Sequence, residues 1–160
     1  MIGEQARRAP TLVRRIVAEG HALGNHTLSH RHPWTMGATA ARAQVRDGAT
    51  TISEVAGIAP SFFRPPHGRR RSCMTAEAER LGERVVMWDV SAIDWGPLGQ
   101  AARVRERLEG VTAGQIVLMH DGRNRHNRPD QLLQALPTLF SRLRESGLTV
   151  SPLPTGRRTH

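Results

Sequence analysis

The sequence contains no lysine, no tyrosine and only one cysteine among its 160 residues. A single thiol cannot form an intramolecular disulfide, so Cys73 excludes a small scaffold held together by disulfide bonds. No apolar run reaches the length that spans a bilayer, and we therefore expect no membrane span. Residues 1–15 are interrupted by Arg and Glu where a secretion signal would be apolar, so the chain as given shows no signal peptide and is expected to be cytoplasmic.

Because lysine is absent, all 23 basic residues are arginines, and the formal net charge is +9. This bias is typical of a GC-rich genome that prefers Arg codons. The arginines are scattered, whereas a nucleic-acid footprint more often gathers basic residues in a stripe with aromatics between them. Nucleic-acid binding is therefore not favoured, although a basic surface attracts polyanions in general. A DNA affinity that falls steeply with salt would reveal it.

The length suits one domain with a hydrophobic core, and we expect a single domain over residues 1–160 with a disordered tail at 154–160. Apolar periodicity predicts helices at about 4–20, 39–57, 75–81, 98–109 and 130–145. Short apolar runs predict strands at 22–24, 61–63, 84–89 and 115–119, and the apolar segment 148–150 follows the last helix. The runs 84–89 and 115–119 are nearly continuous, as in strands buried on both faces. The alternation predicts an α/β fold with a parallel sheet.

His26 and His30 lie four residues apart in the segment Asn-His-Thr-Leu-Ser-His. One helical turn would bring the two imidazoles onto the same face, where their ring nitrogens could share a divalent metal. A catalytic zinc takes three protein ligands and leaves one position for water, so a third ligand has to come from elsewhere. A chance pair at this spacing is the alternative, because the chain has 8 histidines.

Polar side chains follow four successive predicted strands, at the point where each strand ends. They are His26 and His30, Arg64, Asp89 and Asp94, and His120. The carboxyl ends of parallel strands meet at one edge, and active sites in parallel α/β folds are built there. The sequence therefore predicts that these residues contribute to one site.

Four motifs, in order along the chain, resemble those of the polysaccharide deacetylase family, the family 4 carbohydrate esterases that share the NodB homology domain. The segment 26–30 is similar to the family's metal-binding His-(Ser/Thr)-x-x-His, and Phe-Arg-Pro-Pro-His-Gly at 63–68 to its Arg-Pro-Pro-Tyr-Gly. Asp89 to Trp95 resembles the Asp-Trp motif, and 118–120 the Leu-x-His motif. The resemblance extends from near Gly3 to about Val150.

This resemblance implies a metal-dependent hydrolase that removes N-acetyl groups from a glycan such as a chitin oligomer or peptidoglycan. His26 and His30 would then hold the metal, for which we expect zinc first, with cobalt or nickel as alternatives. The metal polarises the acetyl carbonyl and lowers the pKa of bound water. His120 would be the general acid that protonates the leaving amine, and Asp94 would orient it.

The resemblance assigns three further roles. Trp95 and Leu118 would wall an apolar pocket for the acetyl methyl group, and the backbone N–H of His67 would help to bind the oxyanion. Arg64 would pair with an acidic residue in the site. Ordinary structural roles are the alternatives, since Arg64 also suits a surface ion pair and the two apolar residues also suit the core.

The chain departs from the family pattern at its start and at His67, where the family has Tyr. The family opens with a Thr-Phe-Asp-Asp-Gly strand, in which one Asp is the catalytic base and the next is the third metal ligand, and this sequence has no such segment. We therefore expect an incomplete (β/α) barrel that lacks the first βα unit and is open along one side. Loss of a general base typically costs ~10²–10⁴ in rate. An open edge would also favour self-association.

Two hypotheses follow for the function of the chain. The first is a glycan deacetylase with little or no turnover by this chain alone. The second is a catalytically inactive glycan-binding or regulatory remnant, whose binding would survive both chelation and the change His120→Ala. The extracellular substrates of the family would place a whole enzyme outside the cell or in the cell envelope.

Overall fold

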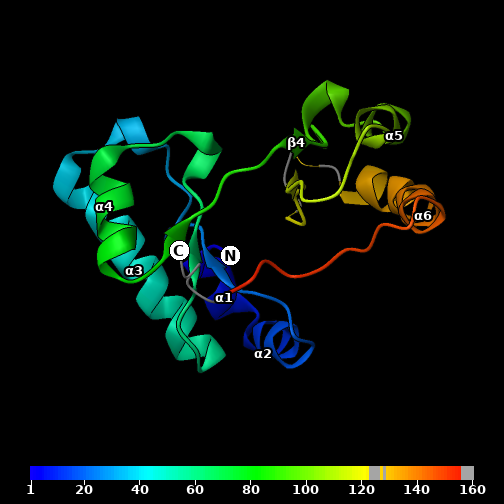
Figure 1. The fold of residues 1–160 in the computed structure, drawn as a ribbon. Helices are drawn as coiled ribbons and strands as arrows, with labels where there is room; N and C mark the ends of the chain where they lie inside the picture. The colour runs from blue at the N-terminus through cyan, green and yellow to red at the C-terminus, as the bar shows by residue number, and fades with distance from the viewer. Residues whose placement is uncertain (123–126, 128, 156–160) are drawn as a thin grey trace. The chain divides into compact units, whose positions relative to one another are not determined.

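The computed structural model describes residues 1–122, 127 and 129–155. The chain forms two compact units (Figure 1). The first unit contains Met1–Val86 together with the C-terminal residues from Pro152, and the second is Met87–Ser151. Each unit has its own sheet and its own core, so the two are described separately. The expectation of a single domain stays a prediction, and most of the expected tail lies outside the described residues.

The first unit contains a three-stranded parallel sheet in the order β1-β2-β3, with helices following each of the first two strands. The strands are β1 (Gly24–Asn25), β2 (Phe62–Phe63) and β3 (Arg84–Val85). Asn25 pairs with Phe63, which pairs with Val85. The helices are α1 (Gly3–Arg8), α2 (Pro10–Ala18), α3 (Ala38–Ala56) and α4 (Ser72–Arg80), with short 3-10 turns η1 (Pro33–Thr35) and η2 (Pro66–Gly68).

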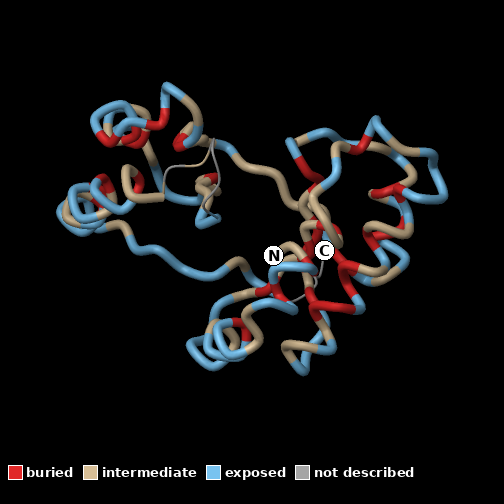
Figure 2. Tube along the Cα trace, turned by 180° about the vertical axis from the view of Figure 1, so that it is seen from behind, coloured by how far each residue is buried: buried red, intermediate tan, exposed pale blue. Residues whose placement is uncertain are grey.

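Helix α3 is the central helix of the first unit, because it packs against α1, α2, α4 and β1. Val45 and Ile52 are fully buried on it, at the helical spacing that puts both on one face. Val45 packs in a cluster with Phe63 and Met74, and Ile52 in a second cluster with Val13. Figure 2 shows the buried residues in red along the Cα trace. This packing fixes the position of the loop that follows β1.

The second unit pairs β4 (Val90–Ser91) with β5 (Val117–Leu118) in parallel. Helices α5 (Ala101–Leu108) and α6 (Pro129–Glu145) pack against each other, and the 3-10 turn η3 (Gly96–Leu98) precedes α5. Their buried faces form one apolar core with Ala92 beside β4. The second unit is therefore a small α/β layer whose strand ends carry the motif residues of the C-terminal half.

The prediction of an α/β fold with an incomplete barrel is confirmed, because the described strands are parallel and form two short sheets that close no barrel. No helix in the described part of the chain is long and apolar enough to cross a membrane. The helices predicted at 39–57 and 130–145 match α3 and α6 closely. The structure has no strand at 148–150.

Two element predictions are wrong. The single helix expected at 4–20 is two helices, because Pro10 disfavours a helical conformation at the preceding Ala9, whose φ is −134° and ψ is 57°. The single buried strand expected at 84–89 ends early, because β3 covers only Arg84–Val85 and residues 86–89 form no strand. The boundary between the two units falls after Val86, and β4 begins at Val90, beyond the predicted run. Arg84 and Asp89 in that run are exposed and residues 85–88 are only partly buried, unlike a strand covered on both faces.

Candidate active site

His26 and His30 come together without a helix, which corrects the helical geometry expected from their spacing. They lie in the loop after β1, where Thr27 has φ 68° and His30 has φ 58°. These left-handed conformations are unusual for residues with a Cβ atom and turn the loop back on itself. The ring centroids of the two histidines are 4.7 Å apart, at an interplanar angle of 65°. The loop thus achieves the proximity that a helical turn would have given.

The imidazole of His26 is held as a neutral ring. Its Nδ1 lies 2.6 Å from the backbone carbonyl oxygen of Arg64, and a carbonyl can only accept, so Nδ1 carries the proton. Burial lowers the pKa of His26 to about 3, although the bond to the Arg64 carbonyl opposes that shift. The Nε2 atom therefore carries a lone pair at neutral pH, as a metal ligand requires.

A buried asparagine holds the histidine loop in place. Asn25 is 0% exposed, and its side-chain oxygen accepts from the backbone N–H of Thr27 at 2.9 Å. Its amide nitrogen donates to the Val45 carbonyl at 2.9 Å and lies 3.0 and 3.1 Å from the two carboxyl oxygens of Glu83. The Thr27 hydroxyl in turn accepts from the backbone N–H of His30 at 3.1 Å. These bonds connect Glu83 to the backbone of the second histidine.

Glu83 is an acid in the interior of the first unit, 2% exposed. Burial raises the pKa of Glu83 to about 7, and the hydrogen bond from Asn25 only partly opposes this. Sequence analysis gave no role to Glu83 or Asn25. Glu83 directly follows Gly82 at the start of an apolar run, and that position next to a strand was the available signal.

The loop also depends on a glycine in the middle of α3. A Cβ atom at Gly48 would lie 2.6 Å from the Thr27 carbonyl carbon and 2.7 Å from the Asn25 side-chain oxygen. The helix and the loop can approach this closely only because residue 48 has no side chain. Glycine is unfavourable within a helix, so its presence inside the predicted helix at 39–57 was a signal of such an approach.

Two further histidines extend the pair into a row of four imidazoles. The His67 ring lies 4.6 Å from the His30 ring, and His32 lies 5.1 Å from His67, between centroids. His67 sits in η2 with φ 56°, and desolvation, followed by the charge of His32, lowers its pKa below the ordinary value. The oxyanion role of its backbone N–H stays a prediction. Sequence analysis did not single out His32.

Arg64 follows β2 and lies against the same loop. Its Nε donates to the Val86 backbone carbonyl at 3.2 Å, and burial lowers its pKa below the ordinary value. This contact, together with the bond from His26 to the Arg64 carbonyl, ties the ends of three neighbouring strands to one another. The predicted ion pair between Arg64 and an acidic residue stays a prediction.

In the second unit, Asp94 and His120 form a direct pair. The His120 Nδ1 lies 2.8 Å from one Asp94 oxygen, and the His120 backbone N–H donates to the other at 2.7 Å. Asp94 is 1% exposed. Burial raises its pKa, but the bonds from the His120 ring and backbone outweigh burial and leave the pKa below the usual value. Asp94 is thus an anion beside a partly exposed imidazole.

Trp95 and Leu118 lie next to this pair. The Trp95 ring meets the His120 ring edge to face, with centroids 5.0 Å apart. Leu118, in β5, is buried, whereas Trp95 is partly exposed. The structure therefore groups the predicted site residues within each unit: His26, His30, Arg64 and His67 in the first, and Asp94, Trp95, Leu118 and His120 in the second.

The described residues supply part of a metal site. Two adjacent imidazoles, one of them fixed as a neutral ring, suit zinc or a similar divalent metal. Within residues 1–122, 127 and 129–155, however, no group of three His, Cys, Asp or Glu side chains is arranged to hold a metal. A catalytic zinc takes three protein ligands, so the described residues do not complete such a site.

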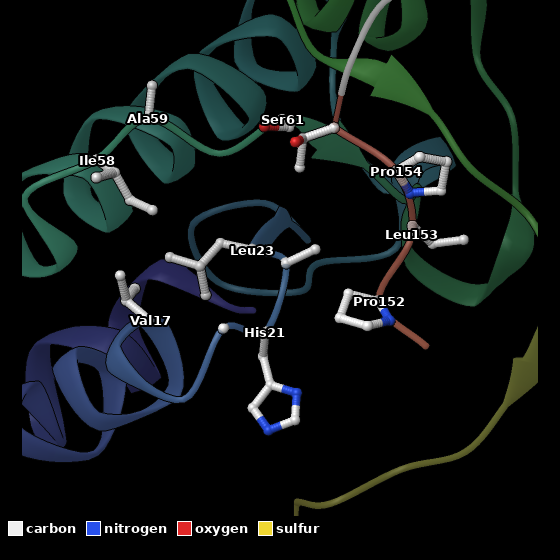
Figure 3. A pocket seen from close by; sticks show the side chains of 12 residues that line it. Val17, His21, Leu23, Ile58, Ala59, Ser61, Pro152, Leu153 and Pro154 are labelled. Carbon is white, nitrogen blue, oxygen red and sulfur yellow. The ribbon is translucent and has the colours of Figure 1, made fainter. Parts of the chain in front are cut away.

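A separate hollow of about 350 Å³ lies at the other end of the strands in the first unit. Figure 3 shows Leu23, Ile58 and Pro154, from three separated segments, around it. Leu23 and Ser61 in its lining precede β1 and β2, whereas the histidine loop follows β1. This hollow is therefore distinct from the candidate active site.

Comparison with known proteins gives one consistent group. Residues 1–86 match the model of the family described as polysaccharide deacetylase. A peptidoglycan-N-acetylglucosamine deacetylase of Bacillus cereus is 28% identical over 97% of this chain and 56% of its own length. A chitooligosaccharide deacetylase of Bradyrhizobium sp. is 31% identical over 96% of this chain and 74% of its own length. The chain therefore spans little more than half of the first of these relatives.

Among solved structures, the fold is similar to a family 4 carbohydrate esterase from Streptomyces lividans in complex with acetate. The TM-score is 0.84 at 27% identity, over 96% of this chain and 77% of that one. The similarity includes both units, since it covers nearly all of the sequence.

Proposed function

Because this chain belongs to the polysaccharide deacetylase family, we propose that it carries the acid half of an N-acetyl hydrolysis site for a glycan. The observation that carries the proposal is the buried Asp94 carboxylate bound to both the ring and the backbone of His120. In the overall reaction, water adds to the acetyl carbonyl carbon and the C–N bond breaks. The products are acetate and a free amine on the sugar.

His120 supplies a proton to the departing amine. The Asp94 anion accepts from Nδ1, so Nε2 is the ring atom that faces away from the carboxylate and can deliver a proton. The same anion stabilises the charged imidazolium before transfer. Trp95 lies edge-on to the ring and, with Leu118, provides an apolar surface beside it for an acetyl methyl group.

His26 and His30 contribute two imidazoles to a divalent-metal site, for which zinc is the first choice. When bound, such a metal polarises a carbonyl group and makes bound water more acidic. Asn25, Thr27 and Glu83 fix the loop that carries the two histidines. Zinc binding, measured by calorimetry, should fall at least about tenfold in His26→Ala. An unchanged affinity in His26→Ala would contradict this assignment.

The substrate class follows from the relatives, which are named for chitooligosaccharide and for peptidoglycan N-acetylglucosamine. We propose an N-acetylglucosamine oligomer as substrate, and hence the cell envelope or the exterior as the place of action. Acetate release from such an oligomer, with added zinc, cobalt or nickel, is the test. Release that is lost in His120→Ala supports the proposal, and release that persists in that variant contradicts it.

A second candidate is an inactive glycan-binding or regulatory protein. It is favoured by one observation, that no group of three His, Cys, Asp or Glu side chains among the described residues is arranged to hold a metal. This function predicts that an N-acetylglucosamine oligomer binds equally well with a chelator present and in His120→Ala. Acetate release at a rate typical of an enzyme would exclude it.

A further inference from the structure

We propose that Trp34 forms a sugar-binding subsite, at which one pyranose ring of the glycan stacks on the exposed indole next to the histidine row. The histidine row is His26, His30, His67 and His32. This inference rests on the proposed glycan substrate and names a residue that neither the family motifs nor the catalytic roles above include. Three features of Trp34 support it: the exposure of its ring, the contacts that hold its turn, and its location beside the histidine row.

Trp34 exposes 62% of its surface, more than any other exposed large apolar residue in the first unit. Tryptophan is rarely left in water without a role, because its ring has a large apolar area to bury. A single exposed Leu, such as Leu12, needs no such explanation. Among the exposed apolar residues of the first unit, Trp34 is therefore the best suited to contact a ligand.

The tryptophan is fixed in place from one side. The Arg71 guanidinium carbon lies 5.4 Å from the ring centroid, within the range of a cation–π contact. The same guanidinium donates to the carbonyl oxygens of Pro33 and Met36, each at 2.7 Å. These bonds fix both ends of η1, the turn that carries Trp34, and Pro33 is itself buried. Because the backbone of the turn is already held, less entropy is lost when a ligand stacks on the ring that it carries.

The turn is continuous with the candidate active site. The backbone N–H of Trp34 donates to Nδ1 of His32 at 3.4 Å. From His32 the row continues to His67 at 5.1 Å and to His30 at 4.6 Å, between ring centroids. Each of these steps is comparable to the width of one sugar ring. A chain of linked sugars could therefore contact Trp34 while a neighbouring unit lies at the histidine pair.

The indole surface of Trp34 suits the apolar face of a sugar ring. One face of a pyranose carries only C–H groups, which are apolar and slightly positive, and the face of an indole is negative. Arg71 already lies over the ring, so the remaining surface suits a neutral ligand better than a second cation. The hydroxyl groups at the edge of the same sugar would meet the imidazole donors and acceptors of His32 and His67.

The test is a titration of the chain with the N-acetylglucosamine tetramer, followed by calorimetry, in the wild type, Trp34→Ala and Trp34→Phe. We expect Trp34→Ala to weaken binding by about tenfold or more, as removal of an aromatic contact residue does. Trp34→Phe should retain most of the affinity, because it keeps a flat apolar ring. Leu12→Ala, an exposed substitution in α2, is the matched control and should bind as the wild type does.

Acetate release, measured in parallel, separates this inference from the proposed function. If the wild type releases acetate but Trp34→Ala binds the tetramer with unchanged affinity, the subsite is wrong and the deacetylase stands. If binding depends on Trp34 but no acetate is released, the subsite stands and the activity is wrong. Absence of tetramer binding by the wild type overturns the subsite as well, and equal losses in Trp34→Ala and Leu12→Ala would do the same.

Discussion

In the first unit the reactive histidines lie on a loop whose shape depends on residues far away in the sequence, whereas in the second unit His120 is held by a carboxylate at the end of the adjacent strand. The histidine loop needs Asn25, Glu83 and the absence of a side chain at Gly48. The pair in the second unit needs little more than Asp94. Two motifs of the same family can therefore differ widely in how many other residues are needed to hold their side chains in position.

The largest effect is expected from breaking the second unit's pair. His120→Ala should lower the rate of acetate release by about 10²–10⁴, because it removes the proposed general acid. The change should also lower the stability, because it leaves the buried Asp94 carboxylate without the donor that the His120 ring provides. Acetate release and urea unfolding measure the two quantities. His21→Ala, an exposed histidine outside the candidate site, is the control and should keep the full rate.

The next effect concerns stability and compares the two units directly. Gly48→Ala should destabilise the chain by about 3 kcal/mol, because the new Cβ meets backbone atoms of Thr27 and the loop must move. Gly99→Ala should act likewise in the second unit, where the Cβ would lie 2.7 Å from the Asp94 carbonyl carbon. Urea unfolding gives the size, and amide exchange shows which unit opens.

Gly110→Ala is the matched control for these glycine variants, since a Cβ at this position would have no atom within 4 Å apart from those of its chain neighbours. A Gly48 variant that speeds exchange equally in both units would contradict the idea that each half is supported independently. So would a Gly48 variant that is as stable as the Gly110 variant.

The smallest effect is a change in the pH dependence of stability. The pKa of Glu83 is about 7 in the folded chain and lower when the chain unfolds, so the folded state binds more protons between these values. The contribution of Glu83 to stability therefore falls as the pH rises through that window, by on the order of 2 kcal/mol between about pH 5 and pH 8. The lowered pKa of His26 acts in the opposite direction, so the Glu83 dependence is measured as the difference between the wild type and a Glu83 variant. Glu83→Gln keeps a carbonyl oxygen for Asn25 and should remove this dependence. Urea midpoints across the pH range measure it.

The control for Glu83→Gln is Glu79→Gln, an exposed acid on α4, which should keep the wild-type pH profile. A Glu83→Gln variant that still loses stability in the same window would show that another group titrates there. Asp94 in the second unit, whose pKa lies below the usual value, should contribute nothing to the dependence in this range.

Long helices with a clear apolar stripe, such as α3 and α6, could be predicted from sequence because packing repeats along them. The positions of β1, β2 and β5 were also predicted to within a few residues, whereas β4 was not predicted. The break at Ala9 follows from Pro10 and could have been predicted by weighing the residue before proline. The end of β3 at Val85 could not be predicted, because a continuous apolar run does not reveal where a strand leaves its neighbour.

The candidate site, too, could be predicted from the sequence only in part. The motif order placed His120 and Asp94 at strand ends, and the structure brings them into contact. The spacing of His26 and His30 suggested a helix, but two left-handed residues in a loop satisfy the same proximity. The buried contact between Glu83 and Asn25 joins residues 58 apart and has no local pattern, so single-sequence reasoning could not find it.

The short contact between the His26 ring and the Arg64 carbonyl has a practical consequence for spectroscopy. A ring proton that is shielded from water in a 2.6 Å bond exchanges slowly, so its nuclear magnetic resonance should be visible at neutral pH. The signal would report whether the imidazole keeps its tautomer. The measurement needs no substrate, metal or turnover, and the resonance of this one proton would show whether the histidine loop keeps its folded conformation.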